Sequence, residues 1–200
     1  MKKIAIVFMV IIAVIACKKN NKILSFSERT SEIRTSVKKV IKGTDTTNFY
    51  DPALLIGAKI PIFEIASLDS TIFNNNSIYG KKAILHFWYR TCPNCMTELP
   101  GLIKFYDEFR NQNIEVLSFA RDTKDELSEV IKSVPFNFPV LVNCGPLMDF
   151  TFEHMYGYPF ILYVDEKGVI TNYIRGESNE TPSADGMYQQ LKTMVQGNKK

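Results

Sequence analysis

The sequence predicts an α/β domain in which a mixed central sheet carries helices on both faces. From residue 82 onward, apolar runs of strand length alternate with amphipathic runs of helix length. Near the C-terminus, two further strand-like runs are joined by a tight turn and followed by a helix. This alternation, closed by a hairpin, places parallel and antiparallel strands in one sheet. With 200 residues, 46% of them hydrophobic, the chain can bury one full core.

The N-terminus has the pattern of an export signal. Lys2 and Lys3 precede the unbroken apolar run 4–16, and Cys17 follows at once. Because this run is shorter than the ~20 residues that a membrane-spanning helix needs, we predict a signal peptide over residues 1–16. The alternative is an uncleaved signal anchor.

Residues 17–51 are polar and rich in Lys, Ser, Thr and Asn. We predict that they form a tether before a folded domain at 52–200. Within the tether, helical spacing followed by a glycine favours a short helix; the residues concerned are Ile33, Val37, Ile41 and Gly43.

The first half of the folded domain predicts a hairpin, a strand and a helix. Residues 61–66 and 71–73 flank a turn and form the hairpin. Residues 82–89 are an apolar run bounded by turn residues, which is typical of a strand buried on both faces. A helix follows over 93–110, and we expect Pro100 to kink it.

The second half continues the alternation. Residues 114–120 form the next strand, and the capping box from Thr123 to Glu126 opens a helix that reaches residue 133. A strand, a helix, a hairpin and a last helix follow, over 138–143, 147–155, 160–165 with 169–173, and from Thr181-Pro182 to 195. These elements account for the mixed sheet.

Two cysteines stand where the strand at 82–89 gives way to a helix. The spacing of Cys92 and Cys95 lets their thiols form a small reversible disulfide, which indicates a redox centre. Because backbone N–H groups and the helix dipole favour a thiolate at a helix N-terminus, Cys92 is the predicted nucleophile. Cys95, one turn further in, would resolve the mixed disulfide.

A zinc site is the alternative use of this pair. It requires four ligands, and no second closely spaced pair exists among Cys144, His86 and His154. We therefore expect no metal and no diffusible cofactor.

The residues around the pair resemble a known family. Residues 88–95, Trp-Tyr-Arg-Thr-Cys-Pro-Asn-Cys, are similar to the thioredoxin-fold signature. Glu98-Leu99-Pro100 resembles the TlpA/ResA branch of membrane-anchored, extracytoplasmic thiol–disulfide oxidoreductases. Downstream, residues 156–165 resemble that family's cis-proline strand, and the extra strand and helix between 121 and 157 match its usual insertion. The resemblance covers residues 57–195.

The resemblance implies a thioredoxin fold with an N-terminal β-hairpin and a central strand–helix insertion. It implies a protein disulfide oxidoreductase, a reductase rather than an oxidase, in which Cys92 and Cys95 form the active disulfide. Electrons would come from a membrane thiol carrier, and the substrates would be disulfide-containing exported proteins such as apocytochromes. The formal net charge is +3, and the sequence shows no basic patch. No nucleic-acid partner is therefore expected.

Val14-Ile15-Ala16-Cys17 resembles the bacterial lipobox. The resemblance implies cleavage before Cys17 and lipid attached to Cys17, and two or more acyl chains make a stable membrane anchor. We therefore predict a location in the cell envelope, facing the periplasm. Some lipoproteins are retained at the inner membrane by an aspartate after the cysteine; Lys18 stands there instead, which favours the outer membrane.

The pair Tyr158-Pro159 precedes an apolar strand. Because proline cannot donate to a central ladder, we predict a cis peptide bond opposite the active site; a trans-proline at a strand edge is the alternative. In thioredoxin-fold proteins the residue before this proline contacts the substrate chain, so Tyr158 is predicted to contribute to substrate selection. We expect the same substrate-binding surface to include Trp88, Pro93 and Asn94.

Three residues have two interpretations each. His86 either handles the proton of Cys95 or is a core histidine. Glu98, three residues after Cys95, either modulates cysteine reactivity or is a solvated or capping carboxylate. Cys144 is either a buried apolar residue or part of a regulatory or intermolecular disulfide.

Two other function classes stay open. A peroxiredoxin-like peroxidase shares the fold and the N-terminal hairpin, but its site expects a proline and a threonine before the nucleophile, which residues 89–91 do not supply in that pattern. A non-enzymatic binding lipoprotein is disfavoured by the two intact cysteines.

Overall fold

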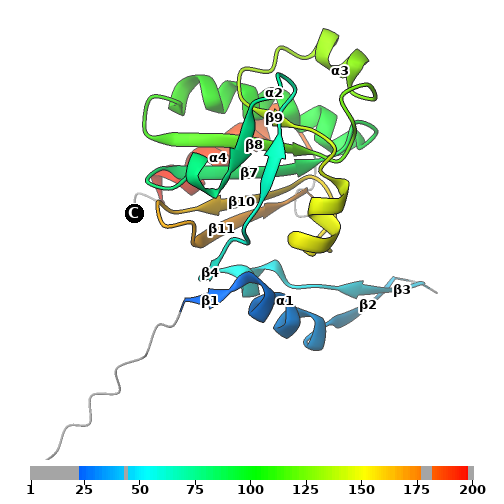
Figure 1. Ribbon diagram of the computed structural model, residues 1–200. Coiled ribbons are helices and arrows are strands. Elements are labelled where there is room, and N and C mark those ends of the chain that lie inside the picture. Colours follow the sequence, from blue (N-terminus) through cyan, green and yellow to red (C-terminus); the bar gives the residue numbers. More distant parts are fainter. Residues whose placement is uncertain (1–22, 43–44, 177–181, 198–200) are drawn as a thin grey trace, which may run out of the picture.

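The structure, a computed structural model, describes residues 23–42, 45–176 and 182–197. Its centre is a five-stranded sheet in the order β11-β10-β7-β8-β9 (Figure 1). Strands β7, β8 and β9 run parallel, and β10 is antiparallel to both β7 and β11. The predicted α/β class and mixed sheet are therefore confirmed. The five strands are β7 (Lys82–Trp88), β8 (Ile114–Ala120), β9 (Val140–Leu141), β10 (Phe160–Val164) and β11 (Ile170–Arg175).

Helices cover both faces of this sheet. The helices α2 (Pro93–Phe109) and α4 (Ala184–Gln196) pack together on one face (Figure 1). The other face carries α1 (Phe26–Thr35), the 3-10 helix η1 (Pro52–Leu55) and the π-helix η3 (Leu147–Thr151). Alternate residues of β7 point to the two sides, with Phe87 in the core under α1 and Trp88 in the core under α2. As predicted, this strand is buried on both faces.

A short hairpin covers the edge of the sheet beside β9. Its strands β5 (Glu64–Ala66) and β6 (Ile72–Asn74) are antiparallel, as predicted. Beyond β5, Ser67 bridges Leu141, and the N–H of Leu68 donates to the carbonyl of Val140 at 2.9 Å. The hairpin thus satisfies backbone groups that an open edge would leave exposed. The remaining short elements are β1 (Leu24–Ser25) parallel to β4 (Ala58–Lys59), β2 (Lys38–Lys42) antiparallel to β3 (Asp45–Phe49), η2 (Asn75–Ser77) and α3 (Ser128–Ser133).

The segment before residue 52 differs from the predicted tether. Ser25 and Glu28 form a reciprocal capping box, in which the Glu28 N–H donates to Ser25 Oγ at 3.3 Å and the Ser25 N–H donates to Glu28 Oε2 at 2.7 Å. Helix α1 therefore starts at Phe26, and its Phe26 and Ile33 are buried in the core. The polar composition of this segment gave no indication that these two side chains pack into the core. The folded part of the chain consequently begins N-terminal to residue 52.

The predicted short helix in this segment exists and contains Ile33, but it lies earlier in the chain than the spacing from Ile33 to Ile41 indicates. The helix ends at Thr35, and Ile41 belongs to strand β2, where its side chain is 72% exposed. Gly43 lies outside the described residues. Helical spacing across this segment was misleading because only the residue inside α1, Ile33, reaches the core.

Other predicted elements also have different bounds in the structure. The strand predicted at 138–143 is only the short β9. The predicted capping box forms, with Thr123 N–H donating to Glu126 Oε2 at 2.8 Å, but a turn follows it and α3 begins only at Ser128. The helix predicted at 147–155 is the π-helix η3. Helix α4 is capped by Ser183, whose hydroxyl accepts from the Gly186 N–H at 3.0 Å; Thr181 lies outside the described residues. Helix α2 continues through Pro100.

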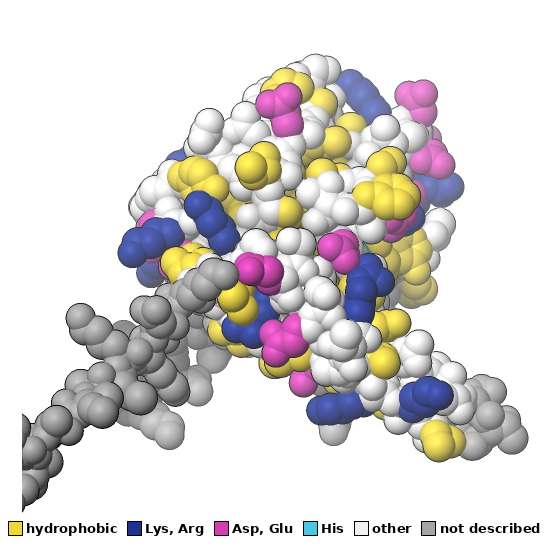
Figure 2. All heavy atoms as spheres, turned by 60° about the horizontal axis from the view of Figure 1, so that its bottom comes forward, with side chains coloured by type: hydrophobic (Ala, Val, Ile, Leu, Met, Phe, Trp, Pro, Cys, Tyr) yellow, Lys and Arg dark blue, Asp and Glu magenta, His cyan; other side chains and the backbone are white. Residues whose placement is uncertain are grey.

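The predicted signal peptide at 1–16 and the lipid site at Cys17 lie outside the described residues. Within the ranges that are described, no helix combines the length and apolar character needed to cross a bilayer. The face shown in Figure 2 carries basic, acidic and apolar side chains interspersed with one another.

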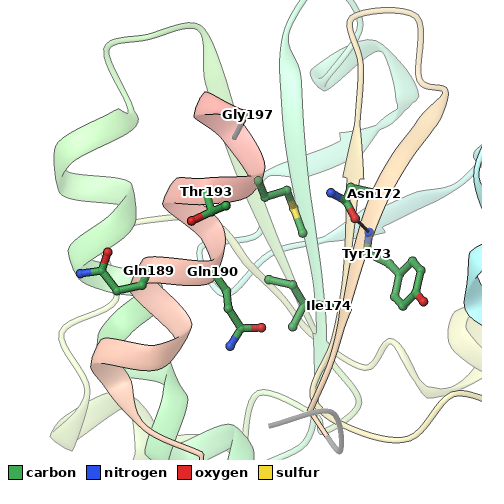
Figure 3. Close-up of a pocket in the computed structure, with 8 residues that line it drawn as sticks. Asn172, Tyr173, Ile174, Gln189, Gln190, Thr193 and Gly197 are labelled. Atoms are coloured by element: carbon green, nitrogen blue, oxygen red, sulfur yellow. Dashed lines mark hydrogen bonds between the residues drawn. The ribbon is translucent and has the colours of Figure 1, made fainter. Parts of the chain in front are cut away.

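A cavity of about 440 Å³ lies between β11 and α4 (Figure 3). Its lining combines polar side chains, among them Asn172, Gln190 and Thr193, with the apolar side chains of Ile174 and Met194. None of the site residues predicted from the sequence lines it. The chemistry indicated by the cysteines therefore lies elsewhere.

Candidate active site

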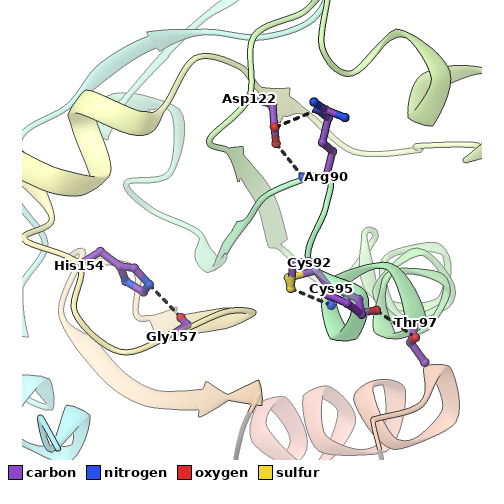
Figure 4. Close-up of a disulfide and its surroundings, with 8 residues drawn as sticks. Arg90, Cys92, Cys95, Thr97, Asp122, His154 and Gly157 are labelled. Atoms are coloured by element: carbon purple, nitrogen blue, oxygen red, sulfur yellow. Dashed lines mark hydrogen bonds and ion pairs between the residues drawn. A yellow bond between two sulfur atoms is a disulfide. The ribbon is translucent and has the colours of Figure 1, made fainter. Parts of the chain in front are cut away.

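Cys92 and Cys95 are joined by a disulfide at the N-terminus of α2 (Figure 4). Cys92 is the N-cap residue, and its Sγ accepts a hydrogen bond from the Cys95 N–H at 3.2 Å. Pro93 occupies the first helical turn, where its missing N–H costs nothing. Because unpaired N–H groups and the helix dipole favour negative charge here, reduction would leave Cys92 poised to ionise.

The two cysteines differ little in exposure in this oxidised form. Cys92 is 3% exposed and Cys95 is 1% exposed. Pro93 is exposed and Asn94 is partly buried, so both border the surface next to Cys92. That they contact substrate stays a prediction.

Trp88 does not lie on that surface. Its side chain is fully buried, stacks on His86 with ring centroids 6.1 Å apart, and contacts Phe136 at 5.9 Å. The reason is its position on β7, since alternate residues of this strand point into the core under α2. We therefore correct the prediction that Trp88 contacts substrate.

The loop before Cys92 is held by Asp122, a residue that sequence analysis did not single out. Asp122 follows β8, and its carboxylate accepts from the Arg90 backbone N–H at 2.7 Å and lies 3.4 Å from Arg90 Nε (Figure 4). Because neighbouring parallel strands end at the same edge of a sheet, the residues after β8 lie beside the residues after β7. That rule is the signal that would have found Asp122.

The Tyr158–Pro159 peptide bond is cis, as predicted. The carbonyl of Pro159 accepts from the Gly176 N–H at 2.9 Å, which ties this segment to the end of β11. Tyr158 is partly buried and packs against the core cluster that contains both cysteines. Its ring lies edge-on to that of Tyr89, with centroids 5.1 Å apart. The active-site loop and the cis-proline segment are therefore in direct contact.

His86 has the surroundings of a core histidine. It is 2% exposed, and its Nδ1 lies 3.1 Å from the Ser118 hydroxyl. Burial lowers the pKa of His86 to about 3. An imidazole this weakly basic is neutral at pH 7 and is a poor acceptor for a thiol proton. The structure therefore favours the core interpretation over a role in proton handling.

We predict that His86 makes the fold sensitive to acid. In the unfolded chain the imidazole takes up a proton near its ordinary pKa of 6.5, whereas the folded chain resists protonation down to about pH 3. The unfolded state binds more protons between these values, so stability falls as the pH is lowered. From pH 7 to pH 5 this one group is expected to remove about 2 kcal/mol from the free energy of unfolding.

Urea denaturation at pH 7 and pH 5 checks this prediction. The His86→Gln variant should lose less stability over this interval than the wild-type chain. His154, whose pKa is lowered by burial to about 4, acts in the same direction in both proteins and leaves a common background. An identical pH dependence in the two chains would contradict the prediction.

The two other ambiguous residues are both buried. Glu98 is 1% exposed, so the interpretation as a solvated carboxylate is wrong. Cys144 is a fully buried free cysteine whose pKa is raised by burial, which makes thiolate formation unfavourable. Its surroundings favour an apolar core role over a regulatory disulfide. Within the described ranges, no three His, Cys, Asp or Glu residues gather closely enough to hold a metal ion.

Sequence relatives carry names that match this chemistry. The chain is 30% identical over 96 residues to sporulation thiol-disulfide oxidoreductase A of Bacillus subtilis (strain 168), which covers 46% of this chain and 57% of that protein. It is 22% identical over 132 residues to the thiol-disulfide oxidoreductase ResA of the same organism, covering 66% of this chain and 73% of the relative. The first match thus spans less than two thirds of that relative's length. The resemblance to ResA seen in the sequence is confirmed.

Solved structures support the fold. The thioredoxin domain of a thiol-disulfide oxidoreductase from Bacteroides vulgatus aligns with a TM-score of 0.58 at 20% identity, covering 70% of this chain and 97% of that domain. The predicted thioredoxin fold is therefore confirmed. Residues 56–173 match the AhpC/TSA family. Because that match spans more than half of the 200 residues, this chain belongs to the AhpC/TSA family.

Proposed function

We propose that this chain is a thiol–disulfide oxidoreductase that reduces disulfides of exported proteins through Cys92 and Cys95. The observation that carries the proposal is the Cys92–Cys95 disulfide at the N-terminus of α2, in contact through Tyr89 and Tyr158 with the cis-proline segment. The names of the sequence relatives support the same reaction class.

The reaction is a pair of thiol–disulfide exchanges. In the reduced chain, the Cys92 thiolate attacks one sulfur of the substrate disulfide, forms a mixed disulfide and releases the first substrate thiolate. Cys95 then loses its proton and attacks Cys92 Sγ, which breaks the mixed disulfide and releases the second substrate thiolate. Both substrate sulfurs are protonated as they leave. The substrate gains two electrons, and the chain ends with the Cys92–Cys95 disulfide.

Glu98 is the residue we propose for exchanging the proton of Cys95. It lies one helical turn after Cys95 on α2 and is buried, whereas His86 is too weakly basic for this role. Since general acid–base assistance contributes about 10²-fold or more, Glu98→Gln should slow resolution of a mixed disulfide by roughly that factor. Stopped-flow measurement of mixed-disulfide decay across pH tests the role, and an unchanged rate profile would exclude it.

The proposed setting is the cell envelope. Signal cleavage before Cys17 and lipid attachment there would place the domain on the periplasmic side, with the outer membrane favoured by Lys18. In that compartment a reduced pair requires an electron source, for which we propose a membrane thiol carrier. Apocytochromes are candidate substrates.

A comparison of two substrates tests the proposed function. The chain is first reduced, then offered a protein disulfide or hydrogen peroxide, and the loss of free thiol is followed in each case. We expect rapid reduction of the protein disulfide and peroxide consumption near the uncatalysed rate. Faster peroxide consumption would favour a peroxiredoxin-like peroxidase instead. In growing cells, a wholly oxidised Cys92–Cys95 pair would contradict the reductive direction.

A further inference from the structure

An arginine–aspartate pair lies behind Tyr158. Arg121 directly follows β8, and Asp149 belongs to the π-helix η3. The guanidinium donates two hydrogen bonds to the carboxylate, at 2.7 and 2.6 Å, and the side chains are 39% and 42% exposed. Their mutual hydrogen bonds raise the pKa of Arg121 and lower that of Asp149, so both are charged at neutral pH. A two-point contact of this kind fixes the plane of the guanidinium.

The hydroxyl of Tyr158 is held between this arginine and η3. Arg121 Nη1 donates to the Tyr158 hydroxyl over 3.4 Å, and that hydroxyl donates to Met148 Sδ over 3.6 Å. Met148 precedes Asp149, so one short helix supplies both the sulfur and the carboxylate. The hydroxyl of Tyr158 thus contacts both the arginine after β8 and the helix η3.

The ring of Tyr158 is fixed from its other sides by two aromatic neighbours. It lies edge-on to Tyr89 at 5.1 Å, and its centroid is 4.5 Å from that of His154. The backbone carbonyl of Tyr89 in turn accepts a hydrogen bond from the Cys92 N–H at 3.1 Å. The Tyr158 ring therefore connects the cis-proline segment, to which it belongs, with the turn that carries the nucleophile.

We propose that Arg121 and Asp149 are positioning residues that fix the Tyr158 ring as a preformed wall for protein chains approaching Cys92. The inference rests on the disulfide exchange proposed above. A protein chain that lies along this wall avoids the entropic cost of ordering the ring on binding. A small disulfide that reaches Cys92 without touching the wall gains nothing. The Arg121–Asp149 pair therefore favours the reduction of protein disulfides over that of small disulfides.

Two substitutions remove the clamp in different ways. Tyr158→Phe keeps the ring and deletes only the hydroxyl, whereas Arg121→Met keeps much of the side-chain bulk and deletes the donor. Each is expected to raise the KM for a protein disulfide about 5- to 10-fold with little change in kcat, as expected for loss of a preorganised binding surface. The double variant should be no worse than either single variant, because both remove one interaction.

Reduction of 5,5′-dithiobis(2-nitrobenzoate) by the full chain provides the second measurement. Its rate should be unchanged in Arg121→Met, which a general loss of structure would not allow. Lys81→Met is the matched control, since it breaks the 2.9 Å ion pair with Glu115 away from the cysteines. It should change neither the KM for the protein disulfide nor the rate of reduction of the small disulfide.

The possible outcomes separate the inference from the proposed function. If the wild-type chain reduces both substrates and Arg121→Met loses both equally, Arg121 is merely structural and the inference is wrong. It is also wrong if Arg121→Met and Tyr158→Phe leave the KM for the protein disulfide unchanged. A wild-type chain that reduces neither substrate overturns the proposed function and the inference with it.

Discussion

Cys92→Ser is expected to abolish disulfide exchange, lowering its rate by at least ~10³-fold, because loss of the nucleophile removes the covalent route. The hydroxyl of serine does not ionise near neutral pH and forms no disulfide, so neither exchange step can occur. The fold should be retained, since serine is a good N-cap residue for α2. The measurement is the rate of protein disulfide reduction by the pre-reduced chain.

Cys95→Ala is expected to have the complementary effect. The first exchange still takes place, but the mixed disulfide at Cys92 then lacks its resolving thiol and accumulates. Non-reducing electrophoresis followed by mass spectrometry identifies the attachment site and the trapped partner.

Cys144→Ala is the control, because this buried free cysteine should be dispensable for exchange. Retained activity in Cys92→Ser, or an adduct on Cys144, would contradict the assigned roles.

Gly101→Ala is expected to destabilise the fold by about 2–3 kcal/mol through overpacking. A Cβ at Gly101 would lie 1.9 Å from the Ala184 carbonyl oxygen and 3.1 Å from Met187 Cβ. The first clash involves backbone, so α2 and α4 must separate to relieve it. The cost of this clash outweighs the ~1 kcal/mol by which alanine normally stabilises a helix interior relative to glycine. For a chain of this size the melting temperature should fall by about 4–12 °C.

Gly145→Ala is the matched control for this prediction. The nearest atom to a Cβ there is Arg121 Cγ at 3.6 Å, which is ordinary van der Waals contact. Its stability should stay within about 0.5 kcal/mol of the wild-type chain. Thermal denaturation of both variants makes the comparison, and an equally stable Gly101→Ala would mean that α2 and α4 do not pack this closely.

The elements that could be predicted were those specified by neighbouring residues. The apolar run before Cys92, the capping box at Thr123 and the turn between β5 and β6 are local patterns, and each appears in the structure. The cis bond before Pro159 followed from a proline next to an apolar strand. The start of helix α1 and its packing against the domain were not predicted, because a polar stretch with only two buried apolar side chains, Phe26 and Ile33, resembles a tether.

The sequence by itself predicted a redox centre at Cys92 and Cys95, the alternation of strands and helices from residue 82 onward and the cis bond before Pro159, because each depends on spacing or neighbours along the chain. Only the tertiary structure decided which side chains are buried and which meet at the site. The alternation of side chains along β7 points Trp88 into the core, and burial lowers the pKa of His86. Arg121, Asp149 and Tyr158 come from three separate segments. Their contact depends on how the end of β8, η3 and the cis-proline segment pack, and no local pattern encodes that arrangement.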